Sequence, residues 1–461
     1  MMRRVASFLA VTALACGSAA PPAATSTVKA RGDADPDGPN RAAIAAQIQP
    51  MIDAELTSGM VVGVYDAGRM EIYGFGKGPG GKPPTGHTLF ELGSVTGVYT
   101  SLLLADSVQR REVELDTPVA ELLPPGVTVP TADKVPITLR HLSLNSSGLP
   151  RTPPSLARAT TENPFAKYDE NALYRDLVHT TLESAPGTRI LYSELGVGLL
   201  GFVLGKKLGG YTQAVQSRIL GPLELHETFF AVPQVEAGRF SQGTNDDLVP
   251  VPHWQFDALV GAGGLISTAH DQLAFLDAEL DAAAGGHNTL RPAMHLTQES
   301  QLEGDGANEG LGWNIDSAGR YWQVGGTGGF RSFIGFDPKT KRGVVLLASS
   351  SISLIDSLAK RIYDVLAGQP VPVPKFPDAM QLSLFAGTYD FQGMKLAMKV
   401  VGKRIYVEGP GEPRIRMLPI SDHEFWIEPL QSVCVFEQKD GKVSRAIFVL
   451  GERQMSAPRI E

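Results

Sequence analysis

Cysteine and positive charge are both scarce in this chain. Its 461 residues include two cysteines, Cys16 and Cys434, which are too few for a disulfide scaffold or a cysteine-rich metal site. The 41 lysines and arginines are outnumbered by 49 acidic residues, and the net charge of −8 argues against nucleic acid as a partner. The nine histidines show no metal-ligand spacing, so the sequence predicts no metal ion and no other cofactor.

The N-terminal apolar run, residues 5–15, is too short to span a bilayer as a stable anchor. Because two arginines precede it, residues 1–20 are predicted to be an export signal. The tetrapeptide Ala13-Leu14-Ala15-Cys16 resembles a bacterial lipobox, whose cysteine is lipidated, and ordinary signal cleavage a few residues later is the alternative. We favour the lipoprotein, which predicts a bacterial periplasmic or cell-envelope protein that touches the membrane only through its lipid. Residues 21–40, rich in Ala, Pro, Ser and Asp, are expected to form a flexible tether.

Helical and strand patterns alternate through residues 41–368. Ala42–Leu56 has helical periodicity, and the next two apolar stretches, Met60–Tyr65 and Met70–Phe75, flank a turn in the manner of a β-hairpin. We therefore expect an α/β (α+β) domain with an antiparallel sheet packed by helices, and a helical lid or subdomain that ends near Ala185. Further strands are expected at Leu311–Ile315, Tyr321–Val324, Ser332–Asp337 and Gly343–Ala348, and a closing helix at Ser353–Leu366.

The C-terminal part of the chain has a different pattern. Residues 369–380 are rich in proline and form a semi-rigid linker. Residues 381–461 contain short alternating strands separated by regular turns, which predicts a separate small β-barrel or β-sandwich, of which we favour the barrel. The expected strands are Lys395–Val401, Arg404–Glu408, Arg414–Pro419, Glu424–Ile427, Cys434–Gln438 and Val443–Leu450.

The most informative stretch is Phe90–Ala105, a short extended segment, a serine and then a helix that is apolar nearly all round. A helix of that kind is buried, so Ser94 is expected at the N-terminus of a core helix. Free backbone N–H groups and the helix dipole there stabilise an alkoxide or an oxyanion. Taken alone, a serine at such a position is more often only a helix cap than a nucleophile.

Five further segments accompany the Ser94 helix in a fixed order. Together they resemble the serine β-lactamase-like hydrolases, a family of class C β-lactamases, penicillin-binding proteins, D-aminopeptidases and esterases. The resemblance covers residues 41–366, and residues 381–461 are similar to the lipocalin-like domain that follows the hydrolase domain in some members. The segments are His141–Pro150, Pro186–Gly196, Gly221–Thr228, Gly263–Thr268 and Gln323–Ser332.

The chain departs from this family at three motifs. In the Ser-x-x-Lys motif Ser94 matches the nucleophile, but Gly97 stands where the proton-accepting lysine is expected. In the Tyr-x-Asn motif Tyr192 matches, and Glu194 replaces the asparagine. In the Lys-Thr-Gly motif Gln323 replaces the cation. Both motif cations are therefore lost and an acid is gained, which argues against β-lactamase or carboxypeptidase activity.

The resemblance also implies the remaining parts of a site. The backbone N–H groups of Ser94 and Gly326 would form an oxyanion hole, which needs no particular side chain. The strand beside the serine would contact substrate through Gln323, Gly325 and Thr327. Whether a nearby cation compensates for the lost lysines is open.

Two functions fit these residues. The first is a serine hydrolase of neutral esters or amine-bearing amides, in which Ser94 is the nucleophile, Tyr192 its proton partner and Glu194 a substitute base or an attractor for cationic substrates. The second is an inactive relative that binds a small-molecule or peptide ligand, or a partner, at the envelope. Arg151 and Arg331 are the candidates for a compensating cation.

Overall fold

The computed structural model describes residues 35–157, 162–303, 308–352 and 354–461. The predicted export signal and residues 21–34 of the predicted tether lie outside the described residues. Residues 35–40 are held by backbone and side-chain contacts, since Ile72 N–H donates to Pro36 O at 2.8 Å and Asn40 Nδ2 donates to Glu71 Oε1 at 3.1 Å.

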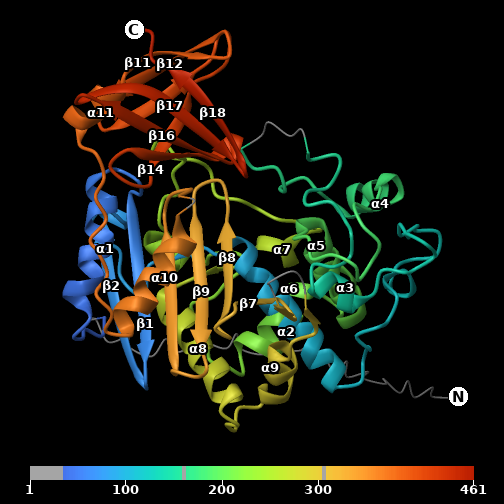
Figure 1. The fold of residues 1–461 in the computed structure, drawn as a ribbon. Coiled ribbons are helices and arrows are strands. Elements are labelled where there is room, and N and C mark those ends of the chain that lie inside the picture. Colours follow the sequence, from blue (N-terminus) through green and yellow to red (C-terminus); the bar gives the residue numbers. More distant parts are fainter. Residues whose placement is uncertain (1–34, 158–161, 304–307, 353) are drawn as a thin grey trace, which may run out of the picture. The chain divides into compact units, whose positions relative to one another are not determined.

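An eight-stranded antiparallel sheet forms the centre of the first domain (Figure 1), in the order β2-β1-β10-β9-β8-β7-β6-β5. The predicted hairpin and the four predicted strands are all present in it, so this part of the fold is confirmed. The strands are β1 Gly59–Asp66, β2 Arg69–Gly76, β5 Leu302–Glu303, β6 Asn308–Gly310, β7 Trp313–Ile315, β8 Tyr321–Gly326, β9 Arg331–Asp337 and β10 Arg342–Ala348.

Side-chain alternation along β1 divides the core into two layers. Val62 and Val64 pack with residues of α1 (Arg41–Asp53) and α10 (Ile355–Leu366) on one face of the sheet. Val61 belongs to the larger cluster on the other face, which includes α2 (Thr96–Gln109) and α8 (Ala269–Ala283). The predicted first and closing helices are thus the cover of one face.

The helix α2 lies inside the larger cluster, and every residue from Thr96 to Ser107 is buried. This confirms the burial predicted from its apolar surface, and it fixes the position of Ser94 just before the helix. The remaining helices of this domain are α3 Leu139–Ser143, α4 Glu170–His179, α5 Glu194–Leu208, α6 Tyr211–Val215, α7 Val260–Gly263 and α9 Arg291–Gln298.

The segment before Ala185, which was expected to be helical, is helical only in part. Among the described residues between 151 and 185, only α4 is a helix, and the chain before it consists of turns and bends. Pro153, Pro154 and Pro164 explain the difference, because a proline inside a helix removes a backbone donor and clashes with the preceding turn.

The C-terminal domain is a near-closed all-β barrel of eight strands in chain order, preceded by α11 (Ala379–Phe385). A bridge between Tyr389 and Arg459 joins the first strand to the end of the chain. The six predicted strands are present, whereas β11 and β18 were not predicted; β18 buries only Ala457 and has no apolar alternation. The strands are β11 Gly387–Phe391, β12 Met394–Val401, β13 Arg404–Glu408, β14 Ile415–Pro419, β15 Glu424–Ile427, β16 Ser432–Lys439, β17 Lys442–Leu450 and β18 Arg453–Pro458.

Cys434 is a free, buried thiol in the barrel core, and burial raises its pKa. A thiol of this kind behaves as a packing residue. None of the helices in the described part of the chain combines the length and hydrophobicity needed to cross a membrane.

Candidate active site

A cavity of about 550 Å³ opens where α2, α5 and β8 begin or end. Every residue that the sequence assigned to the site lines this cavity, together with Arg151 and Arg331. The assigned residues are Ser94, Tyr192, Glu194, Gln323, Gly325, Gly326 and Thr327.

Ser94 reaches the cavity through a tight connection between β3 (Phe90–Glu91) and α2. Gly93 has a φ of 53°, and a Cβ placed on it would lie 2.5 Å from the backbone nitrogen of Gly326. Ser332 Oγ donates to Leu92 O at 2.6 Å and fixes the same connection against β9. Only glycine fits this contact, so the backbones of Ser94 and Gly326 lie in one region, where the oxyanion hole was predicted.

Gly325 makes the second close contact between the serine loop and β8. A Cβ on Gly325 would lie 1.9 Å from Leu92 O and 3.0 Å from the backbone nitrogen of Ser94. A side chain at this position would push the strand away from Ser94. The glycine that matches the family motif is therefore required by packing.

The Tyr192 hydroxyl is buried and has no hydrogen bond to any of the described residues. Burial is the main cause that raises its pKa, and the charge of Glu194 raises it further. The Ser94 hydroxyl and the Arg151 charge act in the opposite direction and lower its pKa. The phenol is consequently protonated at neutral pH, so it can donate a proton but is a poor base.

Glu194 is the first residue of α5, and the helix cap is supplied by its neighbour. Ser193 Oγ accepts a hydrogen bond from Gly196 N–H at 2.9 Å, so Glu194 is not needed as the cap. The Glu194 carboxylate lies 3.8 Å from Arg151 Nε and accepts a hydrogen bond from Thr152 Oγ1 at 3.5 Å. Burial raises its pKa, and Arg151 opposes this change.

Arg331 supplies a second cation to the cavity. Its Nη1 donates to Thr327 O and Phe330 O, each at 3.2 Å, and a Cβ on Gly326 would lie 2.5 Å from the same nitrogen. Burial lowers the pKa of the guanidinium, which nevertheless stays charged because arginine starts so high. The two arginines therefore offset part of the negative charge that Glu194 brings to the altered Tyr-x-Asn motif.

The acidic residues of the cavity come from four separate elements. Glu194 is joined by Asp356 on α10, by Glu428 in the barrel domain and by Glu309 on β6. Burial raises the pKa of Glu309 to about 8, so this carboxyl is mostly neutral at pH 7. Sequence reasoning missed the last three, because no local motif marks a residue whose role depends on which strands and loops meet.

Gln323 and Thr327, two of the positions predicted to contact substrate, differ in whether their side chains are free to hydrogen-bond a ligand. The Gln323 side chain is occupied by backbone groups, since its Oε1 accepts from Val324 N–H at 2.9 Å and its Nε2 donates to Gly312 O at 3.3 Å. Thr327 Oγ1, in contrast, is buried and has no hydrogen bond within the described part of the chain. The Thr327 hydroxyl is thus the side-chain group of β8 and its following turn that is best placed for a ligand.

Gly97 lies where the motif lysine would be, one helical turn after Ser94. A Cβ on Gly97 would lie 3.1 Å from Val197 Cγ1. Val197 of helix α5 therefore packs closely against this position.

Comparison with known proteins shows which family and which solved structures this chain is similar to. The sequence model of the Beta-lactamase family matches residues 44–369. The beta-lactamase of Escherichia coli (strain K12) is 28% identical over 343 residues, which are 66% of this chain and 87% of that protein. The D-alanyl-D-alanine-carboxypeptidase/endopeptidase AmpH of the same strain is 26% identical over 340 residues, 69% and 87% of the two chains. The solved structure of a class C beta-lactamase mutant has the same fold, with a TM-score of 0.61 and 23% identity over 71% of this chain and 97% of that one.

Proposed function

Because the chain belongs to the Beta-lactamase family, we propose that it is a serine hydrolase of neutral esters or amine-bearing amides with altered chemistry. One observation carries the proposal: Ser94, just before a buried helix, lines the same cavity as the buried Tyr192 hydroxyl and the backbone of Gly326. A nucleophile, a proton donor and an oxyanion region are thus present in one cavity.

In the proposed reaction Ser94 Oγ attacks the acyl carbon and the C–O or C–N bond of the leaving group breaks. Because the phenol is protonated and a poor base, it acts as a relay: it passes its own proton toward the leaving group while its oxygen receives the proton of the serine hydroxyl, so the phenol ends neutral. The negative carbonyl oxygen is stabilised by the N–H groups of Ser94 and Gly326. Water then releases the acyl group by the same steps in reverse.

The missing lysine lowers the expected rate. No base hydrogen-bonded to Ser94 is found among the described residues, and removal of a cooperating base commonly costs roughly 10³-fold in rate. Esters are favoured over amides in such a site, because an alkoxide is expelled more easily than an amine anion. Glu194 supports the choice of amine-bearing amides, because its carboxylate attracts a cation.

A second candidate is an inactive relative that binds a small-molecule or peptide ligand in the same cavity. The observation in its favour is the close approach of Val197 to Gly97, the position of the motif lysine, since a Cβ on Gly97 would lie 3.1 Å from Val197 Cγ1. The predicted export signal and lipobox support a position at the bacterial cell envelope for either candidate.

The test is intact mass spectrometry of the purified protein after incubation with a fluorophosphonate, which reacts with an activated serine. We expect one adduct on the unmodified protein. The control is Ser217→Ala, which removes an exposed serine outside the cavity and should also give one adduct. The Ser94→Ala variant should give none. Absence of an adduct on the folded unmodified protein would reject the hydrolase and favour the binding protein.

A further inference from the structure

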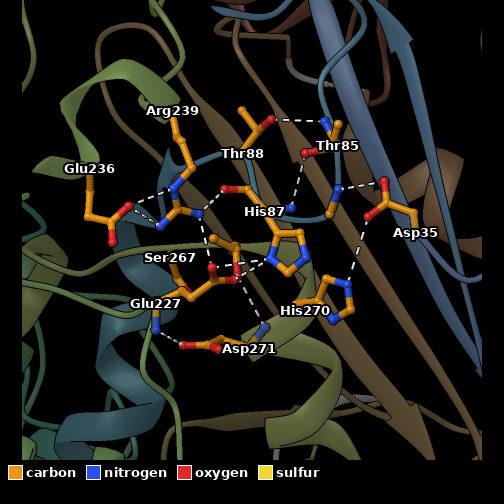
Figure 2. A network of polar contacts seen from close by, with 12 residues as sticks. Asp35, Thr85, His87, Thr88, Glu227, Glu236, Arg239, Ser267, His270 and Asp271 are labelled. Carbon is orange, nitrogen blue, oxygen red and sulfur yellow. Dashed lines mark hydrogen bonds and ion pairs between the residues drawn. The ribbon is translucent and has the colours of Figure 1, made fainter. Parts of the chain in front are cut away.

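Two histidines and an aspartate from three distant segments meet outside the Ser94 cavity (Figure 2). Asp35 precedes α1, His87 precedes β3, and His270 is in the first turn of α8. One ligand atom from each lies within 4.8 Å of the other two. We propose that these three side chains bind a divalent transition-metal ion of the Zn²⁺ type.

His87 is oriented as metal-binding histidines usually are. Its Nδ1 lies 2.9 Å from Glu227 Oε2, so Nδ1 carries the proton and the lone pair is on Nε2. Glu227 is itself fixed, because it accepts from Arg239 Nη1 at 3.0 Å and from Thr268 Oγ1 at 3.0 Å. Figure 2 shows this carboxylate between the arginine and the imidazole. A carboxylate behind a histidine of this kind raises its basicity toward a metal.

Asp35 contributes a buried carboxylate oxygen that a nearby cation would stabilise. Its Oδ2 accepts a hydrogen bond from Gly86 N–H at 2.8 Å, which holds the carboxylate in place. Its Oδ1 is buried, receives no hydrogen bond among the described residues, and lies 3.8 Å from His270 Nε2. A buried anionic oxygen without a donor is costly unless a positive charge is close, and a bound metal ion supplies one.

The two imidazoles are stacked, with ring centroids 4.2 Å apart and an angle of 13° between their planes. Nearly parallel rings cannot both direct an in-plane lone pair at one ion, so metal binding requires one ring to turn about its side-chain bonds. The backbone of His270 is held in place, because its N–H donates to Gly86 O at 3.1 Å. The proposed metal-bound state therefore differs from the stacked arrangement by the rotation of one imidazole ring.

The donor set selects the class of metal. Two imidazole nitrogens and one carboxylate oxygen suit Zn²⁺ and its neighbours, whereas Ca²⁺ and Mg²⁺ prefer sites made of oxygen. The His87 and His270 side chains are 22% and 32% exposed, which leaves room for water as the fourth ligand. None of the three residues lines the Ser94 cavity, so the proposed ion would join residue 35 to α8 independently of the hydrolase chemistry.

The experiment is a calorimetric titration of ZnCl₂ into the full-length protein after chelator treatment and dialysis. We expect one Zn²⁺ per chain, with affinity at least about 100-fold weaker in Asp35→Asn and His87→Gln, and about 10- to 100-fold weaker in Glu227→Gln. The control is His295→Gln. His295 is an exposed histidine whose Nδ1 lies 3.4 Å from Glu299 Oε1, so this variant also removes a histidine that has a carboxylate beside it. That variant should bind as the unmodified protein does.

Two further readouts keep the test decisive. Zn²⁺ should raise the Tm of the unmodified protein and of His295→Gln but not of Asp35→Asn, whose substitution at the edge of the fold leaves the core intact. Co²⁺ should give the visible absorption of a four-coordinate site without a thiolate band. No Zn²⁺ binding, equal binding by Asp35→Asn and His87→Gln, or a thiolate band from Cys16 or Cys434 would overturn the proposal.

Discussion

The guanidinium of Arg151 lies over the ring of Tyr192, with its Cζ 5.5 Å from the ring centroid. The same guanidinium lies 3.8 Å from the Glu194 carboxylate, so one cation contacts both side chains of the altered Tyr-x-Asn motif. Arg151 is itself 72% exposed at its side chain, which limits the strength of both contacts. It therefore moderates the charge of Glu194 without neutralising it.

The charge of Arg151 should control the preference for amine-bearing substrates. Arg151→Gln leaves Glu194 without its cation, and we expect the kcat/KM ratio of an amine-bearing ester to its neutral analogue to rise about 3- to 10-fold. Glu194→Gln should lower the same ratio by a similar factor. The ratio is measured with paired nitrophenyl esters, and changes in the same direction for both variants would contradict the assignment of Glu194 as attractor.

A lysine at position 97 should restore activation of the nucleophile. Because a Cβ at Gly97 would be 3.1 Å from Val197 Cγ1, the lysine is introduced together with Val197→Ala. We expect fluorophosphonate labelling of Ser94 in Gly97→Lys/Val197→Ala to be at least about 10-fold faster than in the unmodified protein. The matched control is Gly97→Met/Val197→Ala, which adds a chain of similar length without the amine. Equal rates in the two folded double variants would show that position 97 does not face Ser94.

Buried Glu279 should make the protein less stable as pH rises. Burial raises the pKa of this carboxyl from 4.5 to about 8. The folded state thus holds a proton that the unfolded state releases, and the stabilisation is complete below about pH 4.5 and is lost as pH rises through about 8. Glu279→Gln keeps an acceptor for Gln298 Nε2, which donates to Glu279 Oε2 at 2.6 Å.

We expect Glu279→Gln to remove roughly 4 kcal/mol of the fall in free energy of unfolding between about pH 5 and pH 9. Urea denaturation at several pH values measures this difference. The exposed substitution Glu183→Gln is the control and should leave the pH profile unchanged. A profile for Glu279→Gln identical to that of the unmodified protein would mean that the carboxyl is not responsible.

Much of the fold was already determined by the sequence. The strands β1, β2 and β7–β10 follow local alternation and turn residues, and burial of α2 follows from its apolar surface, because these patterns depend on neighbouring residues alone. The serine motif and the tyrosine motif likewise identified Ser94 and Tyr192 as residues of one cavity. Local patterns failed at the segment before α4, where prolines prevent a helix, and at β18, which lacks alternation.

Tertiary structure alone decided the charge of the site and the second cluster. Arg151 and Arg331 became cavity residues, and Glu309 and Glu428 joined them, because strands and domains distant in the sequence meet at one opening. The meeting of Asp35, His87 and His270 likewise depends on the docking of three separate segments, so no spacing in the sequence could indicate it. Local residues determine which elements form, whereas the electrostatic balance of a site is a sum over side chains that only the completed packing brings together.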